Sequence, residues 1–206
     1  MRLPDLPDDI LANIIKRVGD DEFYNLKPFF RVGKRSKDLV FREDVLKSAA
    51  IYSLCYDPYN TMEGEPGFWN EGRGRNFMLK CFQHGNPEAI YFEGLRLGVE
   101  RADLRTAISI LRLNSAACPR SSLAIAIFFV LLGEPEESIQ YFEVVFAKHA
   151  PDGSTKLIEI GEGLNSDIQR YNVSYVGHLS DTFKYPDCDS VNTPYCVFDQ
   201  DPNFEF

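Results

Sequence analysis

Apolar residues near the start of the chain recur with the spacing of a helix. The recurring positions are Ile10, Leu11, Ile14, Ile15 and Val18. They lie at i, i+1, i+4, i+5 and i+8, so residues 8–18 are predicted to form one helix with a single apolar stripe. Pro7 and the acidic pair Asp8 and Asp9 are typical of a helix start, and Gly19 is expected to end the helix.

Two further short helices are expected before residue 42. Apolar residues continue over 20–32, but Pro28 should break or restart the helix there. A basic stretch at 31–37 is closed by apolar residues at 39–41, and we interpret it as a turn and a solvated helix face. Three helices in about forty residues bury little apolar surface, so this module is expected to depend on a partner or on the rest of the chain.

The remaining pattern is also helical, and the predicted fold class is all-α. A helix is expected over 43–54, followed by a loop rich in glycine, proline and acids over 56–74, with Phe68 and Trp69 as its anchors. Helical spacing then returns at 75–83, 87–97, 103–113, 120–132 and 135–148. Short loops between successive helices predict antiparallel hairpins, as in a short α-solenoid. The predicted organisation is a three-helix module (1–42), a helix and connecting loop (43–74), helical hairpins (75–150) and an irregular C-terminal cap or tail (151–206).

Composition and charge narrow the possible function classes. Of 206 residues, 44% are apolar, which is enough for a buried core. The net charge of −9 opposes binding to a phosphate backbone, and the nearest basic loop, Gly72 to Arg75, is small, so no nucleic-acid partner is expected. No apolar run approaches about 18 residues, and the start of the chain lacks the features of a signal peptide. Five scattered cysteines do not resemble a secreted disulfide framework, so we expect a cytoplasmic or nuclear protein without a membrane partner.

No group of residues has the spacing of a catalytic site. The loop at 72–75 lacks the Lys-Ser/Thr pair of a phosphate-binding loop and is interpreted as a turn. A zinc site lacks a C-x-x-C pair and a fourth ligand. Its candidate ligands are Cys81 with His84, and His178 with Cys188 and Cys196. These histidines and His149 adjoin no nucleophile or acid in a recognisable arrangement, so we expect no catalysis and no cofactor. A small enzyme within 69–84 is the remaining catalytic alternative.

The first forty residues resemble an F-box. The resemblance covers residues 3–41 and consists of a Leu-Pro pair, an acidic helix start, an aliphatic stripe and a Val-x-Lys pattern near the end. The matching residues are Leu6, Pro7, Asp8, Asp9, Ile10, Leu11, Ile14, Leu26, Val32, Lys34 and Leu39. The chain departs from the family at Gly33, where a Cys or similar small residue is usual, and in lacking the Trp that usually follows the Lys.

Membership of the F-box family implies binding to the Skp adaptor of cullin–RING ubiquitin ligases, and through it to cullin. By position, the contact residues that the resemblance implies are Leu6, Pro7, Ile10, Leu11, Ile14, Val32 and Lys34. An apolar stripe too wide for a three-helix core also favours coverage by a second protein. The alternative is that these residues pack on the helices that follow.

The hairpin region resembles tetratricopeptide repeats, closest to the Sel-like subgroup. The Tyr-x-x-Gly pattern falls on Tyr91 and Gly94, and the Asp-x-x-x-Ala pattern falls on Asp103 and Ala107. A short F-box followed by such hairpins is similar to a plant group of F-box proteins. The implied function is a non-catalytic, substrate-recruiting adaptor whose hairpins bind an unknown target protein for ubiquitination. The alternative is a helical-repeat scaffold with no link to ubiquitination, in which the N-terminal helices form a cap.

Overall fold

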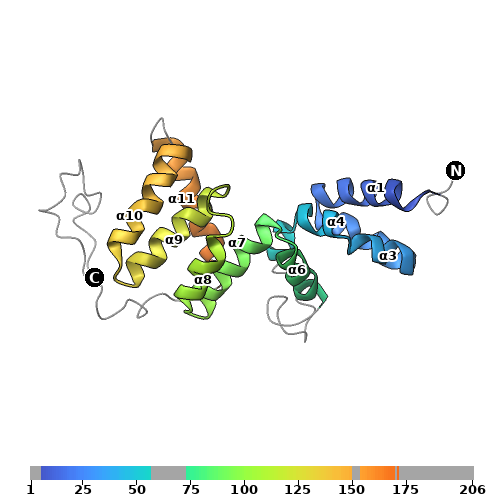
Figure 1. Ribbon diagram of the computed structural model, residues 1–206, viewed down its shortest axis with the longest axis horizontal. Coiled ribbons are helices and arrows are strands. Elements are labelled where there is room, and N and C mark those ends of the chain that lie inside the picture. Colours follow the sequence, from blue (N-terminus) through green and yellow to red (C-terminus); the bar gives the residue numbers. More distant parts are fainter. Residues whose placement is uncertain (1–5, 57–72, 150–153, 170, 172–206) are drawn as a thin grey trace, which may run out of the picture.

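The described part of the chain is helical throughout, as the computed structural model in Figure 1 shows. It comprises residues 6–56, 73–149, 154–169 and 171, and within these ranges there is no strand, so the all-α prediction is confirmed. The helices form an elongated array with α1 and α3 at one end and α10 at the other. The N-terminal elements are α1 (Asp8–Asp21), η2 (Phe23–Leu26), α2 (Lys27–Val32), α3 (Lys34–Val40), α4 (Glu43–Ser48) and α5 (Tyr52–Tyr56).

The second half of the array contains the predicted hairpin helices. Its elements are α6 (Arg73–Gln83), α7 (Pro87–Leu95), η3 (Arg96–Glu100), α8 (Leu104–Leu111), α9 (Pro119–Leu131), α10 (Pro135–Val144), η4 (Val145–His149) and α11 (Ser154–Gln169). Each of α7, α8 and α9 packs on the next helix in the chain, and α11 packs back on α9. Pro87, Pro119 and Pro135 all lie in the first turn of a helix, where the missing N–H of proline leaves no bond unmade.

The first helix confirms the predicted start but not the predicted end. Asp8 and Asp9 occupy its first turn, whereas the helix continues past Gly19 to Asp21. Gly19 is buried, and a Cβ built there would lie 3.2 Å from Leu26. Its small size therefore allows η2 to approach α1 closely, which is a packing role instead of a helix-ending one.

After the end of α1, the segment 20–32 forms η2 and α2. The sequence predicted that Pro28 would break or restart the helix, and Pro28 lies at the restart. The interruption itself lies at Glu22, which is extended, and Pro28 lies in the first turn of α2. Gly33 then separates α2 from α3 at φ +152°, a backbone conformation that side chains with a Cβ rarely adopt. The Val-x-Lys pattern thus straddles a sharp turn between two helices.

The helix predicted over 43–54 is broken, and this prediction is wrong at 49–51. Asparagine 86 explains the break, because Nδ2 of Asn86 donates to the carbonyl oxygens of Leu46 at 2.9 Å and Ala49 at 2.8 Å. The backbone N–H of Ile51 donates to Oε2 of Glu88 at 2.7 Å. Oδ1 of Asn86 also accepts from the first N–H groups of α7, so one buried side chain ends one helix and begins another.

Two further predictions are corrected by the hairpin region. Helix α6 begins at Arg73, so Arg73 to Arg75 are helical where a turn was expected. Helix α11 lies inside the range 151–206 that was expected to be irregular. Its buried positions are Ile160, Leu164 and Asp167. Because Asp167 is acidic, the apolar spacing that usually indicates a helix is interrupted there. The predicted loop anchors Phe68 and Trp69 and the chain beyond Tyr171 lie outside the described residues.

A single apolar core runs through both halves of the array. At the junction, the ring of Phe77 on α6 lies 4.7 Å from that of Phe23, 5.9 Å from that of Phe30 and 6.0 Å from that of Phe41, measured between centroids. These distances are typical of favourable aromatic pairs. The N-terminal helices and the hairpins are therefore parts of one folded unit. Among the helices the structure describes, none is long and apolar enough to cross a membrane.

Gly94, which belongs to the Tyr-x-x-Gly pattern, permits the close contact between α7 and α8. A Cβ built there would lie 2.5 Å from Cγ and 2.6 Å from Cδ2 of Leu111, which is fully buried. We expect Gly94→Ala to lower the free energy of unfolding by about 1–3 kcal/mol in urea denaturation, because a closely packed core resists added volume. Gly161→Ala is the control, since open space surrounds its Cβ in α11 and the substitution should raise stability by about 0.5–1 kcal/mol. Equal effects at both sites would contradict this account.

Candidate docking surface

Arginine side chains hold the start of α1 against α3 and α4. Nε of Arg35 donates to Oδ1 of Asp8 at 2.7 Å, and Nη2 of Arg35 donates to the carbonyl oxygen of Leu6 at 2.5 Å. Arg42 pairs with Asp9 at 3.2 Å. Asp8 and Asp9 therefore form ion pairs as well as lying at the positive end of α1. These pairs hold the Leu-Pro pair in place relative to the Val-x-Lys turn.

The seven predicted contact residues divide into an inner and an outer set. Leu11 is buried at 4% exposure, Leu6 is half-buried against the core, and Ile14 is half-buried. By contrast, 49% of Ile10 and 70% of Val32 are exposed, and Pro7 and Lys34 are also exposed. Part of this stripe therefore packs on the following helices, and part of it faces outward without cover from the described residues.

A hollow of about 250 Å³ lies between α1 and the turn that joins α2 to α3. Its lining residues are Leu11, Phe29, Val32, Gly33, Lys34, Arg35 and Ser36. Three predicted contact residues, Leu11, Val32 and Lys34, thus meet in one place although twenty residues separate them in the chain. Leu6, Pro7, Ile10 and Ile14 do not line it. Phe29 and Arg35 were not predicted; the apolar run around Pro28 was the only sequence signal for Phe29.

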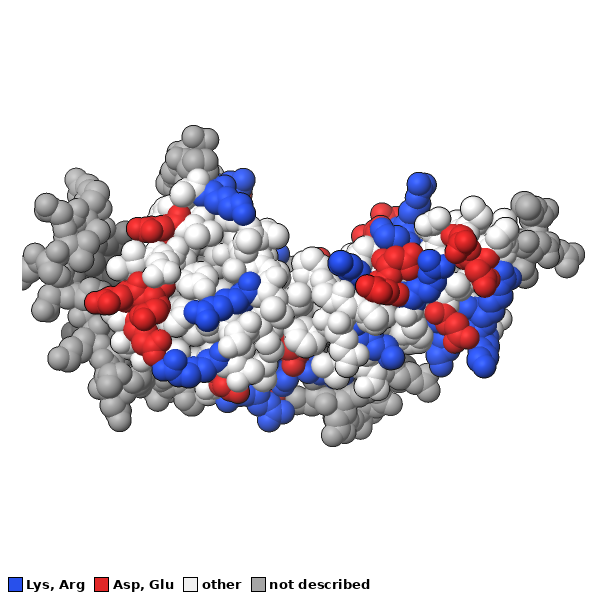
Figure 2. Space-filling model, viewed as in Figure 1, with Lys and Arg blue, Asp and Glu red and all other residues white. Residues whose placement is uncertain are grey.

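The edge of this hollow is positively charged. Residues 27–37 include Lys27, Arg31, Lys34, Arg35 and Lys37 and no acidic residue. We call this segment the α2–α3 basic patch; Figure 2 shows blue side chains over this end of the array. Among the described residues, Arg31, Lys34 and Lys37 form no ion pair. An apolar hollow with a cationic edge suits an apolar side chain flanked by carboxylates.

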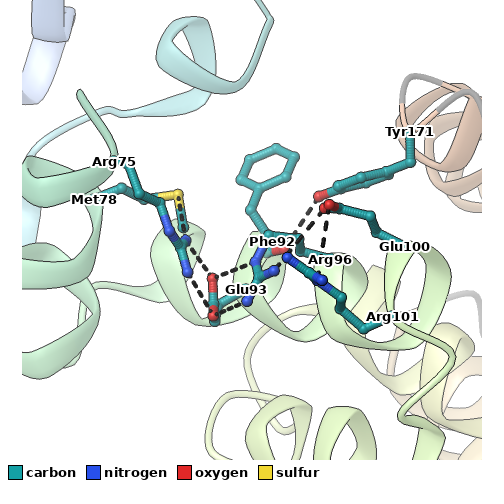
Figure 3. A network of polar contacts seen from close by, with 8 residues as sticks. All are labelled: Arg75, Met78, Phe92, Glu93, Arg96, Glu100, Arg101 and Tyr171. Carbon is teal, nitrogen blue, oxygen red and sulfur yellow. Dashed lines mark hydrogen bonds and ion pairs between the residues drawn. The ribbon is translucent and has the colours of Figure 1, made fainter. Parts of the chain in front are cut away.

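A buried ionic cluster in the middle of the array, drawn in Figure 3, was missed by sequence reasoning. The carboxylate of Glu93 on α7 accepts from Arg75 at 2.5 and 2.8 Å and from Arg96 at 2.9 and 3.2 Å. Tyr171 donates to the carbonyl oxygen of Phe92 close by, at 3.1 Å. Burial by itself raises the pKa of Glu93, but the hydrogen bonds and charges of the two arginines outweigh it and lower this pKa to about 2. Because its carboxylate is fully hydrogen-bonded, the cluster is suited to holding α6 and α7 together instead of to proton transfer.

A second buried network fastens α11 to the array. Oδ2 of Asp167 accepts from the hydroxyl of Tyr91 at 2.8 Å and from Nη1 of Arg120 at 2.6 Å. Burial raises the pKa of Asp167 in spite of these two donors. The guanidinium of Arg120 also lies over the ring of Tyr91, 5.2 Å from its centroid. The tyrosine of the Tyr-x-x-Gly pattern therefore contacts a helix that the sequence did not predict.

The candidate zinc ligands do not form a cluster in the part of the chain that the structure describes. No three His, Cys, Asp or Glu side chains converge there with the geometry of a metal site. Cys81 is buried, and burial raises the pKa of its thiol to about 12, whereas His84 is exposed at the end of α6. A thiol that stays protonated is a poor ligand and a poor nucleophile. His178, Cys188 and Cys196 lie outside the described residues.

We compared the chain with protein-family models, with curated proteins and with solved structures. None of the three comparisons found a match. The F-box and tetratricopeptide-like resemblances therefore rest on the sequence patterns alone.

Proposed function

We propose that this protein is an F-box adaptor, which docks on a Skp protein and recruits a target for ubiquitination by a cullin-containing ligase. One observation carries the proposal. Leu11, Val32 and Lys34, which the F-box resemblance assigns to the adaptor interface, line the same hollow at the end of the array. Residues that are far apart in sequence and share an outward-facing hollow are suited to receiving a partner side chain.

Exposure supports the same choice of surface. Val32 and Ile10 are large aliphatic residues that the described residues leave exposed, and a bound partner would remove them from water. The cationic edge formed by Arg31, Lys34 and Lys37 would orient such a partner through its carboxylates. In this proposal the chain itself performs no bond chemistry, and the helical hairpins α7 to α10 present the surface that binds the target protein.

The test is a titration of the full-length chain with a purified Skp adaptor. We expect Ile10→Asp and Val32→Asp each to weaken binding by about tenfold or more, because burying an unpaired carboxylate costs more than about 1.4 kcal/mol. Ile158→Asp and Leu113→Asp are matched controls, since these aliphatic side chains are 55% and 67% exposed but lie on α11 and in the turn after α8. The controls should bind like the wild type. An unchanged affinity in the Ile10 and Val32 variants, or no binding by the wild type, would overturn the proposal.

A scaffold without a ligase is the second candidate, and the aromatic cluster at Phe77 favours it. There the N-terminal helices close the end of the hairpin core, as a cap would. Deleting residues 1–41 would expose Phe77, so the full-length double variant Ile10→Asp, Val32→Asp separates the candidates better. Proximity labelling compares this double variant with the wild type. If the protein is an adaptor, the variant should lose the ligase subunits and keep the target. If it is a scaffold, the variant should keep every partner.

A further inference from the structure

A segment with charges of one sign lies near each end of the array, and the two segments differ in sign. The α2–α3 basic patch carries five basic residues and no acidic one. Residues 133–147, in and around α10, carry Glu134, Glu136, Glu137 and Glu143 and no basic residue. Figure 2 shows red side chains over α10 at the end opposite α3. The basic patch is local, since Figure 2 also shows red side chains among the blue ones at the α1 and α3 end.

The outer face of α10 combines these acids with exposed apolar side chains. Glu136, Ile139, Glu143 and Phe146 follow one another at i, i+3, i+7 and i+10, so they lie on one side of α10 and η4, while Ser138 and Val145 are buried on the other side. Ile139 is 53% exposed and Phe146 is 49% exposed. Glu134 pairs with Arg105, but Glu136, Glu137 and Glu143 form no ion pair with any described residue.

The α2–α3 end has the complementary features. Its hollow of about 250 Å³ offers space for an apolar side chain, Val32 provides exposed apolar area beside it, and Arg31, Lys34 and Lys37 lack ion-pair partners among the described residues. The two surfaces are complementary. The α10 face presents apolar side chains flanked by acids, and the α2–α3 end presents a hollow flanked by basic residues.

We propose that the protein associates head to tail, with the α10 face of one copy docked on the α2–α3 basic patch and hollow of a second copy. One molecule cannot join its own two patches, because they lie at opposite ends of a continuous helical core. The contact is heterologous, so each added copy leaves one free patch of each kind. The association therefore forms open chains instead of a closed dimer. This inference does not rest on the adaptor proposal, although a Skp protein bound at the hollow would compete with the second copy.

Sedimentation velocity on the full-length chain tests the association. At about 0.15 M salt we expect the mean sedimentation coefficient to rise steadily as protein concentration increases from about 1 to about 100 μM, and at about 1 M salt we expect a monomer throughout, because salt screens the ion pairs. Lys34→Glu with Lys37→Glu, or Glu136→Lys with Glu143→Lys, should each give a monomer. Lys47→Glu with Lys156→Glu is the control for net charge on exposed lysines outside the patches and should associate like the wild type.

Combining the reversed variants distinguishes a head-to-tail contact from general charge effects. A mixture of the lysine variant and the glutamate variant places opposite charges at both contacts between unlike copies, so it should form growing chains although each variant alone stays monomeric. The variant with all four substitutions likewise sets opposite charges against each other at the substituted positions and should associate again. A wild type that stays monomeric at about 100 μM, a dimer that does not grow with concentration, or reversed variants that associate as the wild type does would each overturn the proposal.

Discussion

Replacing Glu93 by glutamine is expected to lower the free energy of unfolding by about 3 kcal/mol at pH 7. The lowered pKa of Glu93, about 2 against an ordinary 4.5, measures how strongly Arg75 and Arg96 favour its ionised form in the folded protein, and each pKa unit corresponds to about 1.4 kcal/mol. Both arginine side chains are only 11% exposed, so they would be left buried beside a neutral amide. Urea denaturation at pH 7 measures the difference directly.

The same carboxylate predicts how stability depends on pH. Because the pKa of Glu93 is lower in the folded than in the unfolded state, its contribution is present above about pH 4.5 and is lost as the pH falls from 4.5 toward 2. The raised pKa of Asp167 acts with the opposite sign, since a raised carboxyl pKa favours folding at lower pH. Glu93→Gln should therefore be less sensitive to acid than the wild type over this range.

A matched control for Glu93 is available on the surface. Glu134 pairs with Arg105, whose side chain is 71% exposed, so Glu134→Gln should cost less than about 1 kcal/mol. If Glu93→Gln and Glu134→Gln destabilise the protein equally, or if Glu93→Gln keeps the acid sensitivity of the wild type, the buried cluster does not stabilise the fold.

Phe77→Ala is expected to lower the free energy of unfolding by about 3–5 kcal/mol, because it removes a fully packed ring from the centre of the core. The ring contacts Phe23, Phe30 and Phe41, which belong to η2, α2 and the turn after α3. The loss should therefore loosen the N-terminal helices from the hairpins as well as create a cavity. Circular dichroism in urea measures the loss, and hydrogen exchange at residues 8–48 measures the loosening.

Two controls separate the junction from general effects of truncation. Phe146→Ala removes a ring of the same size that is 49% exposed, so its cost should stay within about 1 kcal/mol. Phe77→Leu keeps most of the volume and should cost less than Phe77→Ala. A small loss in Phe77→Ala, with unchanged exchange in the N-terminal helices, would mean that the first module folds independently of α6.

This dependence bears on the docking surface. The hollow lies between α1 and the α2–α3 turn, and the rings of Phe23, Phe30 and Phe41, in or next to the N-terminal helices, pack against Phe77. Docking is therefore best measured on the whole chain, and variants at exposed Ile10 and Val32 are more informative than variants at buried Leu11, because only the exposed ones leave the core intact.

Local signals in the sequence were sufficient for the helical class and for the starts of α1, α7, α9 and α10. An amphipathic stripe, a first-turn proline and an acidic first turn act through neighbouring residues of the same segment, so they can be recognised without knowing the rest of the fold. The predicted contact residues also included three that line one hollow, because the F-box resemblance preserves the order and spacing of Leu11, Val32 and Lys34.

Contacts between distant segments decided the rest. Asn86 breaks the helix expected over 43–54 from nearly forty residues away, and Asp167 gives α11 a buried carboxylate whose partners, Tyr91 and Arg120, come from other helices. A single sequence shows neither partner. Two further features depend on which helices pack together. Ile10 faces outward while Leu11 faces the core, and Arg75 lies in α6 and pairs with Glu93 instead of ending a loop. Periodicity identifies the apolar side of a helix, but only the assembled array determines how much of that side remains exposed to a partner.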